Sequence, residues 1–202
     1  MNAALDDAVE LMERSLAYTR VALADVDDAV LGRPTPCSAW TLDALLDHMG
    51  DALDAFTEAA VGWVDVRRPA PAPNRVTALQ DRACALLGAW AQAAPEAVTV
   101  GDRTVPASLV VATAALEITV HGWDVGRATG RGTPIPSRLA RDLLPVARAV
   151  VMPADRGVRF AAERPAAGSA YDARLLAFLG RDLTGPAGKI RSNPGTGPAA
   201  AS

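Results

Sequence analysis

The sequence is poor in the residues that mark several large classes of protein. Among its 202 residues only two are histidine, two are cysteine and one is lysine, and aromatic residues make up 4%. The formal net charge is -3 and no stretch is strongly basic, which argues against a nucleic-acid-binding protein, because those usually carry a clustered basic patch. No apolar run approaches the roughly 18 residues that a membrane-spanning helix needs, so we expect no membrane partner either.

The N-terminus and the cysteines favour a reducing compartment. The first 14 residues, MNAALDDAVELMER, are acidic and amphipathic, whereas a secretory signal would begin with basic residues followed by an apolar block. We therefore expect a cytoplasmic protein, in which Cys37 and Cys84 are free thiols. The single lysine, Lys189, beside abundant Ala, Arg, Asp, Gly and Pro indicates a high-GC genome.

What the sequence does have is helical periodicity. Half of the residues are hydrophobic, enough for one sizeable core, and from Leu5 to Val30 apolar positions recur every three or four residues, which predicts one long helix. Residues 98–105 alternate around Gly101-Asp102 and predict a short hairpin or an extended connection. Similar patterns predict further helices over 41–61 (with Thr41 as N-cap), 76–94, 106–128, 137–151 and 171–182. Residues 66–74 are predicted to form a loop between the first two of these helices.

These elements define the expected architecture. Long helices that return along one another form a bundle, and bundles commonly build sites from side chains on facing helices. We predict an all-α four-helix bundle with short C-terminal additions, a single domain over residues 1–185. The Gly-, Pro-, Ala- and Ser-rich residues 186–202 have little to bury and are predicted to be a disordered tail.

The candidate chemistry centres on the two histidines. Glu117 and His121 are four residues apart on one predicted helix, so their side chains share a face, and His48 lies in an apolar stretch of another helix. Two histidines and one glutamate form a typical three-residue ligand set of a catalytic zinc site. A hydrogen-bonded His–Glu pair without a metal would also satisfy a buried carboxylate, so from the residues alone both interpretations stay open.

Three segments resemble a known family. TPCSAWTLDALLDHMG (35–50), EITVHGWDVGRATG (117–130) and YDARLLAFLGRD (171–182) are similar to the DinB/YfiT-like superfamily, specifically the actinobacterial, single-domain relatives of mycothiol-dependent maleylpyruvate isomerase N-terminal domains. The resemblance implies a four-helix bundle that binds a divalent metal, often zinc. It also implies that His48, Glu117 and His121 are the metal ligands.

The same resemblance implies a function. We expect a metal-dependent enzyme that activates a low-molecular-weight thiol, mycothiol by family likeness, for S-transfer, addition or isomerisation on a small electrophile. The isomerase has an additional C-terminal domain where this sequence has a tail, so we expect that general chemistry rather than maleylpyruvate isomerisation itself. Two alternatives stay open: a hydrolase or lyase that uses metal-bound hydroxide, and a non-catalytic metal-binding stress-response protein. Bundles of this family often pair, so a homodimer is also considered.

Four further residues near the histidines are candidates for the site. Asp124 is placed to accept a hydrogen bond from His121 and orient it. Trp40 and Trp123 are candidate walls of a substrate pocket, and Arg127 could bind a substrate carboxylate. Each has a structural alternative: a helix-bridging acid for Asp124, core packing for the tryptophans and a surface ion pair for Arg127.

The two cysteines are given structural interpretations. Cys37 precedes a helix N-terminus, where a thiolate is favoured, so a nucleophile or a fourth metal ligand is one interpretation. No third histidine could serve as its base, and we prefer a small core residue. Cys84 falls on the apolar stripe of the predicted third helix and is expected to be buried.

Overall fold

Helices account for nearly all the regular structure. The computed structural model describes residues 3–37, 40–62, 75–92 and 95–183. In this part of the chain the elements are α1 (Ala3–Leu23), α2 (Leu42–Ala59), α3 (Arg75–Ala91), β1 (Ala97–Val100), β2 (Arg103–Pro106), α4 (Ala107–Thr129), α5 (Ser137–Val150), the 3-10 turn η1 (Pro153–Asp155) and α6 (Tyr171–Phe178). The predicted all-α class is confirmed.

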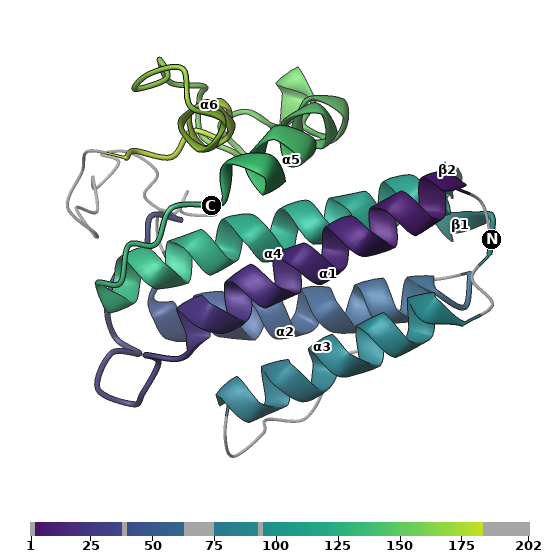
Figure 1. Ribbon diagram of the computed structural model, residues 1–202, viewed down its shortest axis with the longest axis horizontal. Coiled ribbons are helices and arrows are strands. Elements are labelled where there is room, and N and C mark those ends of the chain that lie inside the picture. Colours follow the sequence, from purple (N-terminus) through teal and green to yellow (C-terminus); the bar gives the residue numbers. More distant parts are fainter. Residues whose placement is uncertain (1–2, 38–39, 63–74, 93–94, 184–202) are drawn as a thin grey trace, which may run out of the picture.

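The centre of the fold is the pairing of α1 with α4. Figure 1 shows these two helices side by side, with α2 and α3 on one side and α5 and α6 on the other. The helices approach closely at Gly122, where an added Cβ would overlap with the Thr19 side chain. Thr19 Oγ1 donates a hydrogen bond to the Ile118 carbonyl at 2.7 Å across this contact. Because α4 is covered by neighbours on most sides, most of its residues are buried, the polar His121 and Asp124 included.

The first helix is shorter than its apolar pattern predicts. The stripe continues to Val30, but α1 ends at Leu23 and residues 24–25 and 28–32 form turns. Asp27 Oδ1 accepts a hydrogen bond from the Ala29 N–H at 2.9 Å, a local side-chain bond that competes with helical pairing. The prediction of one helix to Val30 is therefore wrong after Leu23, although Val30 is still buried.

Local signals set the ends of α2, the hairpin and α4. Thr41 accepts a hydrogen bond from the Ala44 N–H at 3.3 Å, as predicted for its N-cap. The predicted hairpin is confirmed: β1 and β2 pair antiparallel, with Val100 opposite Arg103. The two-residue turn between them contains Gly101 at φ +60°. Gly130 ends α4 in the left-handed conformation.

The C-terminal helix ends in a turn that aims the next residues back toward the bundle. The Arg181 N–H donates to the Leu176 carbonyl at 2.8 Å and the Gly180 N–H donates to the Ala177 carbonyl at 3.0 Å, the two bonds of a Schellman motif. Gly180 has φ +78°, and a Cβ there would also press against Ala161. Two constraints thus favour glycine at the residue before Arg181.

Some sequence-based predictions fall on other parts of the chain. The predicted loop at 66–74 and the predicted tail at 186–202 lie outside the described residues, so both stay predictions. Among the helices that are described, none combines the length and the apolar character required to cross a bilayer. Cys84 is exposed, so its predicted burial is wrong: the face of α3 that carries it does not pack against the core.

Candidate metal centre

Three side chains from two helices converge in the bundle. His48 comes from α2, and Glu117 and His121 come from successive turns of α4. Each offers a ligand atom within 4.8 Å of the others. Glu117 Oε2 lies 3.0 Å from His121 Nε2, and the two imidazole rings meet edge to face with centroids 5.0 Å apart. The three residues singled out from the sequence as possible ligands are thus brought together.

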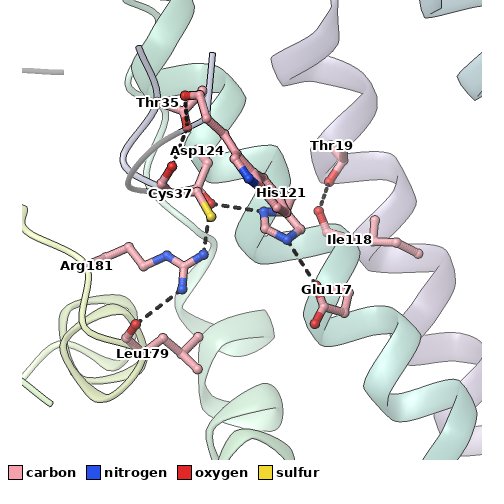
Figure 2. Close-up of polar contacts among 10 residues, drawn as sticks. Thr19, Thr35, Cys37, Glu117, Ile118, His121, Asp124, Leu179 and Arg181 are labelled. Carbon is pink, nitrogen blue, oxygen red and sulfur yellow. Dashed lines mark hydrogen bonds and ion pairs between the residues drawn. The ribbon is translucent and has the colours of Figure 1, made fainter. Parts of the chain in front are cut away.

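His121 is held by a carboxylate on each ring nitrogen. Its Nδ1 lies 3.1 Å from Asp124 Oδ2, and its Nε2 faces Glu117 (Figure 2). Burial opposes protonation of this imidazole, but the hydrogen bonds with Asp124 and Glu117 outweigh it and raise its pKa to about 9. Without a metal, the ring therefore carries a positive charge between two acids at neutral pH.

His48 occupies a different electrostatic environment. Partial burial is the main cause that lowers its pKa, and the nearby His121 lowers it further. A neutral imidazole is the form that binds metals. The Trp40 ring lies 4.7 Å from the His48 ring and 6.3 Å from the His121 ring, centroid to centroid, so Trp40 covers both histidines on one side.

An arginine that the sequence analysis did not select completes the buried charges. Arg181 Nη2 donates to Asp124 Oδ2 at 3.0 Å, and its side chain is 9% exposed while that of Asp124 is fully buried. Figure 2 shows the Arg181 guanidinium turned toward Asp124 from the segment after α6. Burial alone would raise the Asp124 pKa, but Arg181 and His121 lower it, so this carboxylate stays ionised. The motif YDARLLAFLGRD contains Arg181, and its position in that motif was the available sequence signal.

Cys37 lies at the edge of the same cluster. It is partly exposed rather than a core residue, and burial is the main cause that raises its thiol pKa to about 11. Its sulfur, His121 and Asp124 form a second group of potential ligand atoms within 4.8 Å. Asp124 Oδ2 already accepts from Arg181, however, whereas Glu117 faces only the histidine in the hydrogen bonds described here. The set with His48 and Glu117 is therefore the better cation site.

A cavity of about 440 Å³ opens onto these side chains, and we call it the polar cavity because it holds the histidines, Glu117 and two arginines. Its walls include Trp40, Cys37 and Arg181 together with the three candidate ligands, and residues 157–161 close it from the C-terminal part of the chain. Arg159 adds a second positive charge on this wall. Arg181 Nε is buried and has no hydrogen-bond partner among the described residues. Leu116, Val120 and Leu179 also line the cavity, and Asp155 and Asp124 pair with the two arginines. The lining therefore suits a small molecule that has both polar and apolar parts.

Two of the predicted pocket residues are placed elsewhere. Trp123 is 3% exposed and packs in the core, and Arg127 lies over its ring at 5.7 Å from the centroid. Neither residue lines this cavity. Both project from turns of α4 that face away from His121, since positions two and six residues along a helix do not share its face.

The donor set fits a zinc-type cation. Two imidazole nitrogens and a carboxylate oxygen are typical zinc ligands, and here the three atoms lie within 4.8 Å of one another. Asp124 would fix the tautomer of His121 by accepting Nδ1–H, leaving the Nε2 lone pair for a cation. The Nε2 proton shared with Glu117 in the metal-free protein lies where that cation would bind.

Comparison with known proteins identifies relatives of this chain. Residues 12–126 match the family model of the mycothiol maleylpyruvate isomerase N-terminal domain. Uncharacterized proteins from two strains of Mycobacterium tuberculosis are each 32% identical over 168 residues, which cover 80% of this chain and 90% of theirs.

Two solved structures are also similar. They are the mycothiol-dependent maleylpyruvate isomerase and a point mutant of it, with TM-scores of 0.48 and 0.47 at 20% identity. The alignment covers 60% of this chain and 60% of each isomerase chain.

Proposed function

Because the chain belongs to the mycothiol maleylpyruvate isomerase N-terminal domain family, we propose that it is a metal-dependent enzyme that uses a low-molecular-weight thiol. The observation that carries the proposal is the convergence of His48, Glu117 and His121 within 4.8 Å. These residues are proposed to hold a divalent cation, with zinc favoured by the nitrogen and oxygen donors. A bound zinc ion supplies Lewis acidity and brings the pKa of a coordinated thiol toward neutrality.

The residues around the ligands have separate roles in this proposal. Asp124 holds His121 Nδ1, and Arg181 compensates the charge of Asp124. Trp40 shields the two imidazoles from water on one side. Arg159 and Arg181 give the polar cavity a positive wall that suits an anionic group on the thiol or on its reaction partner.

Mycothiol is the proposed co-substrate, on the strength of the family. Its sulfur would form a bond to an electrophilic carbon of the substrate while the thiol proton is released to solvent. In an isomerisation the thiol is eliminated again after bond rotation, so no oxidant or reductant is consumed. In an addition the neighbouring carbon takes up a proton from solvent and the carbon–sulfur bond remains. In an S-transfer the carbon–sulfur bond replaces the bond to a leaving group, which departs with its electron pair.

The first experiment tests the metal. Protein purified without chelator should contain about one zinc per chain by elemental analysis, and His121→Ala should lose it. Asp51→Asn, next to His48 on the exposed face of α2, is the matched control and should keep the metal. Unchanged zinc content in His121→Ala would refute the ligand assignment.

The second experiment tests the thiol. In calorimetric titrations mycothiol should bind the zinc-loaded protein more tightly than S-methyl mycothiol, because only the free thiol can become a thiolate. The difference should vanish in the His121→Ala protein. Turnover of an electrophile panel that needs no thiol would favour a hydrolase or lyase instead. Zinc binding without mycothiol binding or turnover would favour a non-catalytic metal-binding protein.

A further inference from the structure

A second cavity reaches the candidate ligands from between α1, α2 and α3. Its volume is about 590 Å³, larger than that of the polar cavity. The walls are largely apolar and come from three helices: Leu16 and Leu23, Leu53 and Phe56, and Leu79 and Leu87. Its floor on α4 consists of Glu117, Ile118 and His121.

The two cavities share two of the three candidate ligands. Glu117 and His121 line both, whereas His48 and Arg181 line only the polar cavity. The position between Glu117 and His121 is therefore accessible from a polar and from an apolar side. Such a two-sided site would let a hydrophilic thiol and a less polar partner approach the same two residues from different cavities.

The size and chemistry of the larger cavity favour a small molecule as its occupant. Small-molecule sites are typically concave, roughly 300–1,000 Å³, mostly apolar and equipped with a few convergent polar groups. This cavity has the apolar walls, and Glu117 and His121 are the polar groups at its floor. Exposed Glu13, Arg20 and Asp81 are also among its lining residues.

We propose that this cavity receives the apolar body of the electrophilic substrate, an alkyl or aryl group attached to the reacting carbon. The hydrophilic thiol then occupies the polar cavity, and the two reactants meet at Glu117 and His121. This inference rests on the proposed function for the identity of the ligand as a substrate. The cavity itself can be tested without any metal.

The first test uses metal-free protein and two alcohols that differ only in length. Methyl NMR titrations should show octan-1-ol shifting the resonances of Leu16, Leu87 and Ile118. Its affinity should be roughly 250-fold above that of butan-1-ol, since each of the four additional buried methylenes contributes about fourfold. Ala83→Trp and Ala17→Trp, on two walls of the cavity, should each weaken octan-1-ol binding at least tenfold. Ala85→Trp, exposed on α3 and outside the cavity, is the matched control and should bind as the parent does. The proposal would be overturned if octan-1-ol and butan-1-ol bind with equal affinity, or if neither Ala83→Trp nor Ala17→Trp weakens octan-1-ol binding.

The second test asks whether the cavity leads to the metal. Octanohydroxamate and acetohydroxamate carry the same metal-binding head, so in calorimetry with zinc-loaded protein the longer ligand should bind at least tenfold more tightly. Ala83→Trp should remove that gain and leave acetohydroxamate unchanged. Equal affinities for the two ligands would refute a substrate role for the cavity even if octan-1-ol binds there.

The two proposals fail in different ways. If no metal binds, the proposed function fails, and the alcohol titrations still decide whether the apolar site exists. If zinc binds but neither the alcohol nor the long hydroxamate gains from its chain, the apolar site fails alone. A second copy of the chain is the other possible occupant of the cavity. The proposal is wrong if the parent protein is dimeric by light scattering and does not bind octan-1-ol, while the Ala83→Trp variant is monomeric.

Discussion

Replacing Asp124 with asparagine should lower the free energy of unfolding far more than the loss of an exposed ion pair does. Asp124 is completely buried and accepts from both His121 Nδ1 and Arg181 Nη2 through its Oδ2 atom. Asparagine keeps the shape but leaves Arg181, whose side chain is 9% exposed, as a buried cation without a counter-charge. Breaking one partner of a buried pair typically costs about 3–5 kcal/mol, and that is the loss expected in the free energy of unfolding.

A matched variant isolates the effect of burial. Asp54 also pairs with an arginine, Arg82, but these side chains are 31% and 23% exposed, so Asp54→Asn should cost no more than about 1 kcal/mol. Urea unfolding of the metal-free proteins at pH 7, followed by far-UV circular dichroism, measures both values. The double variant Asp124→Asn/Arg181→Met should recover part of the loss, because it removes the orphaned charge. The reasoning is refuted if Asp124→Asn costs no more than Asp54→Asn, or if removing Arg181 as well adds a further full penalty.

The same substitution should affect the metal separately from stability. Partners of metal-bound histidines typically change metal affinity by about 10–100-fold when they are removed. A competition titration with a zinc chelator should therefore show weaker binding to Asp124→Asn than to Asp54→Asn. A full loss of binding would indicate that Asp124 is itself a ligand and would favour the alternative group with Cys37.

Three further predictions concern other parts of the molecule. Gly122→Ala should lower the free energy of unfolding by about 1–3 kcal/mol in urea, because its Cβ would overlap with Thr19, whereas Gly88→Ala, with open space around it, should not destabilise. Burial would raise the pKa of Asp142, but Arg14 and Arg141 lower it, so its pair with Arg14 stabilises the fold above the usual aspartate pKa. The stability gap between the parent and Asp142→Asn should therefore be present at pH 7 and shrink as the pH falls below 4; a gap that is independent of pH would contradict it. In metal-free protein iodoacetamide should modify exposed Cys84 before Cys37, as peptide mass mapping can show, and the reverse order would contradict the positions of the two thiols.

Much of the bundle could be predicted because its signals are local. The N-cap at Thr41 and the Gly101-Asp102 turn each act within a few residues, and both lie where the sequence predicts them. The end of α1 could not be found from periodicity, because the apolar spacing continues past Leu23 while Asp27 bonds to the local backbone. Val30 keeps its buried position without being helical. Spacing therefore predicts burial here better than it predicts secondary structure.

The candidate ligands were predictable for a different reason than their surroundings. Glu117 and His121 share a helix face by spacing, and His48 is the only other histidine in the sequence. The family resemblance then favoured a metal over a metal-free His–Glu pair. Whether Trp123 and Arg127 face the site depends on how α4 is rotated against its neighbours, and that rotation follows from the α1–α4 contact at Gly122. The exposure of Cys84 likewise depends on which face of α3 meets the bundle. Alanines occur on several faces of α3, so the apolar pattern alone does not identify the buried face.

The electrostatic environment of the site depends on a part of the chain outside the matched family region. The family model ends at residue 126, but the charge that compensates Asp124 comes from Arg181. Arg181 reaches Asp124 because Gly180 takes a left-handed turn pressed against Ala161, which closes α6 and reverses the chain. The family match therefore accounts for the candidate ligands, whereas the arginines of the polar cavity come from the turn at 157–159 and from the segment after α6. Relatives that keep the ligands but replace this segment should differ in the charge of the small molecules they accept.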